Sequence, residues 1–255
     1  MRLIISKDYQ ELSKRTAEII ASQVRVHRHT VLGLATGSTP VGAYKELIRL
    51  SEEEALDFSN VDTFNLDEYI GLKDSHPQSY RHFMNENLLN HINVSPERTH
   101  VPNGIAANLD EECHNYDKMI DACGGIDLQL LGMGNNGHIG FNEPGPAFVA
   151  PTNVVQLTDS TIKANSRFFH DETEVPKKAI TMGFRPIMQA RQIIFVVSGE
   201  AKAEVVHQAL QGPVIPSVPA SILQLHSDLI VVLDEAAASS LDRELLARQG
   251  HCIKA

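Results

Sequence analysis

Tryptophan is absent from this sequence, and cysteine is scarce, with three residues in 255. Cys113, Cys123 and Cys252 are odd in number and lack the paired spacing of zinc ligands, so we expect reduced thiols and no metal site. Long apolar runs are also missing, since none reaches the length of a membrane span or of a signal-peptide core. These absences predict a cytoplasmic protein without a membrane partner.

Positive charge is scarce as well. Lysine and arginine number 22 against 32 aspartates and glutamates, which gives a formal net charge of -10 at pH 7. Nucleic acids and anionic membranes require a dense basic surface, so neither is an expected partner. Any anionic ligand must therefore be small and must be bound by a local cluster of donors.

Short apolar runs rich in β-branched residues recur along the chain, at residues 30–34, 61–66, 126–131, 192–197 and 228–233. Their near-continuous apolar character is typical of strands buried on both faces. Amphipathic stretches between them, for example 12–24 and 83–89, predict helices. This alternation predicts an α/β fold with a mostly parallel, Rossmann-like sheet and helices on both faces. No linker divides the chain, so we expect residues 1–255 to form a single domain, with ligands at the carboxyl ends of the strands.

A hydroxyl-rich turn follows the run at 30–34, and it consists of Thr36, Gly37, Ser38, Thr39 and Pro40. Gly37 permits a tight turn, and Pro40 fits the start of a helix, where its missing N–H costs nothing. Backbone N–H groups at a helix N-terminus bind anions, although an ordinary capped helix has the same residues. The position at a strand end favours phosphate binding.

Two carboxylates, Asp67 and Glu68, follow the run at 61–66. In a cleft, partial burial raises the pKa of a carboxylate and makes it a usable general base. The alternative is a solvated turn, so we expect at most one of the two to be catalytic.

A glycine-rich loop at 132–145 surrounds His138, with an amide, Asn136, two residues before it and a carboxylate, Glu143, five residues after it. Five glycines let the backbone approach a ligand closely. A histidine with such neighbours can exchange a proton near pH 7. Farther along, Arg167 and Lys202 are bases that could bind a phosphate, although each taken singly is typical of a surface residue.

These stretches together resemble the glucosamine-6-phosphate deaminase family, which belongs with ribose-5-phosphate isomerase, CoA transferase-like proteins and 6-phosphogluconolactonase in a wider group. The resemblance rests on motifs that occur in order along nearly the whole chain: Thr-Gly-Ser-Thr-Pro at 36–40, Phe-Asn-Leu-Asp-Glu-Tyr at 64–69, His-Pro-Gln-Ser-Tyr at 76–80, Gly-His-Ile-Gly-Phe-Asn-Glu-Pro at 137–144, Ala-Asn-Ser-Arg-Phe-Phe at 164–169 and Gly-Glu-Ala-Lys-Ala at 199–203.

The resemblance implies an isomerising deaminase, a hydrolase of a C–N bond that converts glucosamine 6-phosphate and water to fructose 6-phosphate and ammonia without a cofactor or metal. It implies that Asp67 moves a proton from C2 to C1, and that His138, oriented by Asn136 and Glu143, assists ring opening. It further implies that the substrate phosphate is bound by Thr36, Gly37, Ser38, Thr39, Arg167 and Lys202. The segment at about 152–176 resembles the active-site lid of the family.

Two departures from the family pattern affect these expectations. Asn136 stands where well-known members have Asp, and we expect Asn136→Asp to be tolerated and Glu143→Gln to be severe. Residues 146–156 contain no Lys or Arg, and the chain stops at Ala255, whereas members activated by N-acetylglucosamine 6-phosphate bind it with basic residues there and near a longer C-terminus. We therefore expect no such activation, and a monomer or small homo-oligomer.

Three alternatives remain at this point. A 6-phosphogluconolactonase shares the fold but lacks the motifs at 64–69 and 141–144. A non-catalytic sugar-phosphate sensor normally has a DNA-binding segment before the fold, and here the first predicted strand begins by Leu3. A zinc hydrolase would need closely spaced ligands, and the close pair His27 and His29 lies at the end of a predicted surface helix.

Overall fold

The computed structural model describes residues 1–166, 169, 171, 174–248 and 252–254. Eight parallel strands form the main sheet in the order β11-β1-β10-β9-β6-β2-β3-β5. Their bounds are β1 Arg2–Ser6, β2 Val31–Leu34, β3 Asp62–Asn65, β5 Thr99–His100, β6 Leu128–Leu131, β9 Gln192–Val197, β10 Leu229–Asp234 and β11 Cys252–Lys254. The five apolar runs are all strands, so the predicted parallel α/β sheet is confirmed.

Helices cover the main sheet, except α5, which lies beyond the carboxyl ends of its strands. The described helices are α1 Tyr9–Val26, α2 Val41–Glu54, α3 Tyr80–Asn87, α4 Leu109–Ala122, α5 Asp159–Asn165, α6 Phe184–Met188, α7 Ala203–Gln211 and α8 Arg243–Arg248. Short 3-10 turns lie at Leu89–His91, Pro96–Arg98, Glu200–Lys202 and Pro219–Leu225. None of these helices, as far as the chain is described, is long and apolar enough to cross a bilayer.

Of the two helices predicted from amphipathic spacing, α1 is confirmed and α3 ends earlier than expected. Helix α1 begins after Asp8, whose side chain accepts a hydrogen bond from Glu11 N, and it buries Leu12 as the pattern predicts. Helix α3 ends two residues before the predicted stretch does, because Leu88 leaves the helical region at φ -151°. Leu88 and Leu89 are buried nevertheless, in an irregular turn, so apolar spacing indicated burial there without indicating a helix.

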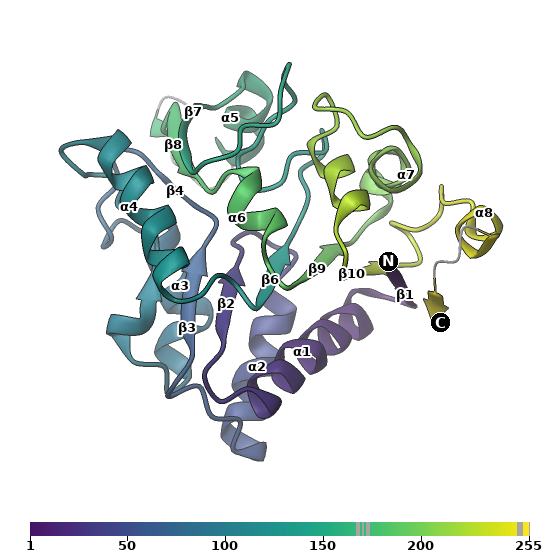
Figure 1. The fold of residues 1–255 in the computed structure, drawn as a ribbon, viewed down its shortest axis with the longest axis horizontal. Helices are drawn as coiled ribbons and strands as arrows, with labels where there is room; N and C mark the ends of the chain where they lie inside the picture. The colour runs from purple at the N-terminus through teal and green to yellow at the C-terminus, as the bar shows by residue number, and fades with distance from the viewer. Residues whose placement is uncertain (167–168, 170, 172–173, 249–251, 255) are drawn as a thin grey trace.

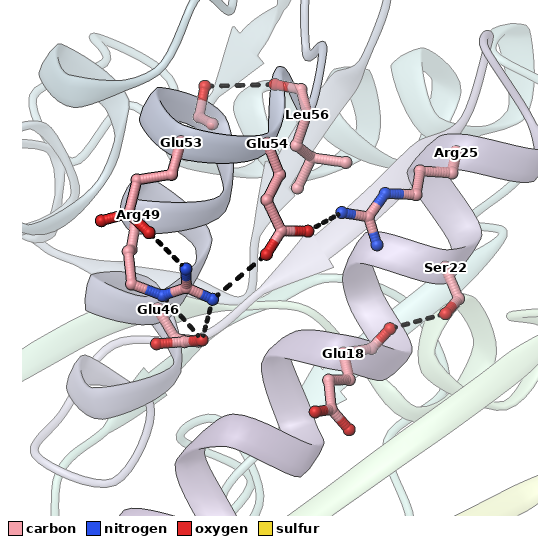
Figure 2. A network of polar contacts seen from close by, with 9 residues as sticks. Glu18, Ser22, Arg25, Glu46, Arg49, Glu53, Glu54 and Leu56 are labelled. Atoms are coloured by element: carbon pink, nitrogen blue, oxygen red, sulfur yellow. Dashed lines mark hydrogen bonds and ion pairs between the residues drawn. The ribbon is translucent and has the colours of Figure 1, made fainter.

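A network of ion pairs joins α1 to α2 (Figure 2). Arg49 lies 2.7 Å from Glu46, 2.5 Å from Glu53 and 3.4 Å from Glu54, and Arg25 of α1 lies 2.7 Å from Glu54. The pairs are partly exposed, and such pairs contribute at most about 1 kcal/mol each. Arg25, Glu53 and Glu54 lie at the carboxyl ends of the two helices, away from the start of α2.

A second, three-stranded antiparallel sheet has the order β4-β8-β7 and was not predicted. Its strands are β4 Asp67–Tyr69, β8 Lys178–Thr181 and β7 Asn153–Gln156. The chain passes from β3 into β4 through Leu66, so the two carboxylates after β3 belong to this second sheet. Figure 1 shows β4, β7, β8 and α5 beyond the carboxyl ends of the main strands. A small apolar cluster joins Tyr69 of β4 and Ala179 of β8 to Phe141 and Leu157.

Candidate active site

A cavity of about 670 Å³ opens at the carboxyl ends of β2, β3 and β6. It is lined by eight of the residues singled out in the sequence: Thr36, Gly37, Ser38, Thr39, Asp67, Asn136, His138 and Lys202. Glu143 lies behind His138, and Arg167 lies outside the described residues. Strand ends that are far apart in sequence therefore meet at one site, as expected for a parallel sheet.

Asp67 and Glu68 are both buried, but they face different surroundings. The Asp67 carboxylate lines the cavity and is 6% exposed. No residue within the described ranges donates a hydrogen bond to it. Burial, assisted by the negative charge of Glu68, raises its pKa well above that of an ordinary aspartate. Asp67 is thus a carboxylate with high proton affinity that faces a ligand-sized space.

Glu68 is directed at the beginning of α3. Its Oε1 accepts hydrogen bonds from the backbone N–H of Tyr69 at 2.8 Å and of Tyr80 at 2.9 Å, and its Oε2 accepts one from Arg81 N at 3.0 Å. Burial raises its pKa, and these backbone bonds oppose the shift. Because Ser79 caps the same helix end, Glu68 completes the cap of α3 and has a structural position.

His138 lies beside Glu143, with Nδ1 3.4 Å from Oε2, and this contact is an ion pair when the imidazole is protonated. Asn136 contacts this pair differently from the expectation: its Nδ2 donates to Glu143 Oε2 at 2.6 Å, and its Oδ1 accepts from the backbone N–H of His138 at 3.2 Å. Burial opposes ionisation of Glu143, but the hydrogen bond and charge of His138 and the bonds from Thr161 and Asn136 prevail, and its pKa falls to about 2. The site therefore holds an ionised Glu143 beside the imidazole.

Two glycines of the loop are required by close contacts at the site. A Cβ on Gly134 would lie 2.1 to 2.5 Å from three atoms of the imidazole ring, so the ring packs directly on the glycine backbone. Gly140 has φ +58°, and a Cβ there would lie 2.8 Å from Thr181 Oγ1 and 3.3 Å from Asp67 Oδ2. The glycine-rich loop thus brings the imidazole and the Asp67 carboxylate to the same cavity.

The hydroxyl-rich turn is held by a residue that the sequence did not indicate. The hydroxyl of Tyr9, in α1, accepts a hydrogen bond from Gly42 N at 2.9 Å and lies within 3.0 Å of Ser38 O and 3.1 Å of Thr39 O. Gly37 adopts φ +100° at the tight turn, as expected. These contacts fix the turn at the N-terminus of α2, where backbone dipoles favour an anion.

Lys202 enters the cavity from a 3-10 turn after β9, and its Nζ donates to Met133 O. Asp234 holds this turn in place, because its carboxylate accepts hydrogen bonds from Ser198 Oγ and Gly199 N. The cavity therefore has a cation near the start of the glycine-rich loop.

An aromatic wall closes another side of the cavity. The rings of Tyr69 and Tyr80 lie 4.9 Å apart, and Phe141 stacks on Tyr80 with centroids 5.8 Å apart. Burial raises the pKa of Tyr69 to about 12, so its phenol stays protonated. Asn165 of α5 donates to the Tyr69 hydroxyl at 2.8 Å. Phe169 also lines the cavity, so the side that faces α5 is aromatic.

The two cysteines whose side chains the structure describes lie away from the cavity. Cys113 and Cys123 are free thiols outside its lining. Throughout the ranges that the structure describes, no group of three or more His, Cys, Asp or Glu side chains is placed to hold a metal ion.

A family model described as glucosamine-6-phosphate isomerases/6-phosphogluconolactonase matches residues 6–231. The chain belongs to this family. Among its relatives, the glucosamine-6-phosphate deaminase of Clostridioides difficile (strain 630) is 53% identical, over 95% of this chain and 97% of that protein. The glucosamine-6-phosphate deaminase of Clostridium perfringens (strain 13 / Type A) is 55% identical, over 94% of this chain and 100% of that protein.

Solved structures of the family agree with the observed fold. A monomeric glucosamine-6-phosphate deaminase superposes with a TM-score of 0.92 at 46% identity, covering 94% of this chain and 100% of that one. The 6-phosphogluconolactonase of Trypanosoma brucei gives a TM-score of 0.73 at 20% identity, covering 94% and 99%, and so shares the fold alone. The resemblance to the deaminase branch is confirmed by these comparisons.

Proposed function

We propose that this chain is a glucosamine-6-phosphate deaminase that converts glucosamine 6-phosphate and water to fructose 6-phosphate and ammonia. The observation that carries the proposal is one cavity with three groups: a buried carboxylate of raised pKa at Asp67, the His138–Glu143 pair, and an anion site at the start of α2 with Lys202. Relatives at 53% and 55% identity that bear this name support it.

Asp67 acts as the general base on the opened sugar. It takes the proton from C2 and returns it to C1, which turns the C2 amine into an imine that water attacks, with release of ammonia. A carboxylate of raised pKa is a better proton acceptor than an ordinary aspartate, and its burial keeps the transferred proton from bulk water. The cavity face of Asp67 is free of protein donors in the described part of the chain, so its lone pairs are available to substrate.

His138 opens the sugar ring by moving a proton between the anomeric hydroxyl and the ring oxygen. Glu143 stabilises the imidazolium that forms in this step, and Asn136 positions Glu143 by donating to its Oε2. The role of Asn136 therefore consists in holding the carboxylate and the loop backbone, with no direct contact to the ring.

The turn at 36–39 and Lys202 bind the substrate phosphate, and Arg167 is proposed to join them. A fixed phosphate orients C1 and C2 toward Asp67, so binding far from the reacting atoms contributes to the rate. We further propose that residues 1–255 act as one domain and that 152–176 is a lid over the phosphate-bound sugar. One end of this lid is anchored, since Thr152 donates both its N–H and its hydroxyl to the buried Asp117.

Regulation by N-acetylglucosamine 6-phosphate is not part of this proposal. Residues 146–156 carry no Lys or Arg to bind its phosphate, and a relative of known structure is described as monomeric. We expect a cytoplasmic monomer or small homo-oligomer with hyperbolic kinetics. A sigmoidal rate curve that becomes hyperbolic on addition of N-acetylglucosamine 6-phosphate would contradict this expectation.

Product analysis tests the function directly. Glucosamine 6-phosphate is incubated with the enzyme in EDTA, and fructose 6-phosphate and ammonia are measured by coupled assays, with 6-phosphogluconolactone as the alternative substrate. Equimolar fructose 6-phosphate and ammonia are expected. Hydrolysis of the lactone without ammonia release would instead identify a 6-phosphogluconolactonase, and no turnover of either substrate would favour a sensor.

A further inference from the structure

One face of α5 contacts the site at two points. Thr161 and Asn165 are four residues apart, so they lie on the same side of the helix, and both line the cavity. Thr161 contacts Glu143, and Asn165 contacts Tyr69. Asn165 belongs to the motif at 164–169, but Thr161 was not singled out in the sequence, because its contact with Glu143 joins segments that the pattern of strands and helices does not bring together.

The hydroxyl of Thr161 has a defined polarity. It accepts a hydrogen bond at 3.2 Å from the hydroxyl of Thr158, the residue that caps α5, so its own proton is directed to Glu143 Oε1. A hydroxyl that already accepts one bond and donates another is held in one orientation. Thr161 is also buried, at 5% exposed, so water does not replace it readily.

The carboxylate of Glu143 is therefore shared between two segments. The glycine-rich loop contacts Oε2, through Asn136 at 2.6 Å and His138 at 3.4 Å, whereas α5 contacts Oε1 through Thr161. A carboxylate turns about its last bond when one of its oxygens loses its partner. The orientation of Glu143 toward His138 thus depends on the contact that α5 makes through Thr161.

We propose that Thr161 is a positioning residue through which α5 sets the Glu143 carboxylate against His138, so that the ring-opening pair depends on this contact from α5. This inference rests on the proposed function for its kinetic consequence. Without the Thr161 hydroxyl, Glu143 loses the donor at Oε1 and keeps only the contacts at Oε2.

The groups around Glu143 predict how its pKa changes when the Thr161 hydroxyl is removed. Among the described residues, His138 is the titratable group that faces the carboxylate, and the other contacts, Asn136 and Thr161, are neutral. Removing a donor from an ionised carboxylate raises its pKa. Less Glu143 is then ionised at low pH, and the titration of its carboxylate moves to higher pH.

Three variants test the proposal. Thr161→Val keeps the shape of the side chain and removes the donor, Thr161→Ser keeps the donor, and Lys163→Gln changes an exposed residue of the same helix. In Thr161→Val, kcat is expected to fall about 10- to 100-fold, the effect of a lost hydrogen bond to a charged group, with a smaller change in KM. Thr161→Ser should restore most of the rate, and Lys163→Gln should match the wild type.

A second readout does not depend on turnover. The carboxyl carbon of Glu143, identified by its loss in Glu143→Gln, is followed by NMR in glutamate-labelled protein as the pH is lowered. Its titration is expected to move up by about one pH unit in Thr161→Val and to return in Thr161→Ser. Unchanged titration in Thr161→Val, or failure of Thr161→Ser to restore it, would overturn the inference. An inactive wild type would instead count against the proposed function, and the titration would still decide the role of Thr161.

Discussion

Asp67 and Glu68 look equivalent in the sequence, but replacing each by its amide should change the stability of the fold in opposite directions. Glu68→Gln leaves the shape of the side chain unchanged. The amide oxygen can take the place of Oε1 and keep the bonds from Tyr69 N and Tyr80 N, but the amide nitrogen then faces the N–H of Arg81. One buried donor at the start of α3 loses its acceptor and meets a second donor.

The size of this effect follows from the number of lost contacts. An unsatisfied buried donor costs about 1–3 kcal/mol, and the release of a buried charge from Glu68 offsets part of that cost. We expect a net loss of about 1–2 kcal/mol in the free energy of unfolding. For a chain of this length, that loss lowers Tm by about 2 to 8 °C. The value of kcat should stay within about twofold of wild type, because Glu68 does not line the cavity.

Asp67→Asn is the matched control for stability, measured by calorimetry at pH 7. The folded pKa of Asp67 is raised, so the fold retains its proton where the unfolded chain has lost it, and stability falls as pH rises from about 3.9 toward the folded pKa. Asparagine avoids this loss, so Tm should be equal to that of the wild type or higher. The reasoning is refuted if Glu68→Gln keeps Tm and lowers kcat more than tenfold.

Other predictions follow from the same site. Gly134→Ala should lower kcat at least about tenfold with little change in circular dichroism, because its Cβ would displace the His138 ring; full activity would contradict the ring position. The acid limb of kcat/KM should lie well above pH 4, since Asp67 must be ionised and its pKa is raised. Glu143→Gln should lower kcat severely. Asn136→Asp sets two carboxylate oxygens about 2.6 Å apart, so it should lower kcat less, and most at high pH. Steady-state pH profiles of both variants measure these losses.

Much of the fold could be predicted because strands buried on both faces are continuous apolar runs. The residues at 192–197 and 228–233 form β9 and β10 within one position of the expected bounds. The second sheet escaped prediction because its strands are three or four residues long and one of them begins with two carboxylates. The end of α3 escaped because buried Leu88 has the same sequence pattern in a turn as in a helix.

The site could be predicted in part for a related reason. Asp67 and His138 follow strands, and the carboxyl edge of a parallel sheet brings such residues together whatever their separation in sequence. Asp67 and Glu68 can be distinguished only once the position of α3 is known, because backbone N–H groups at the start of that helix donate hydrogen bonds to Glu68. Tyr9 and Thr161 reach the site from other helices, through contacts that no local pattern records.

The central claim is that Asp67 moves the proton between C2 and C1, and the most direct test is the turnover of glucosamine 6-phosphate by Asp67→Asn beside the wild type. The account predicts a loss of at least about a thousandfold in kcat, the upper range for a general base, with Tm unchanged or raised. Turnover within tenfold of the wild type in a correctly folded Asp67→Asn would contradict the account, because another group would then have to take the proton.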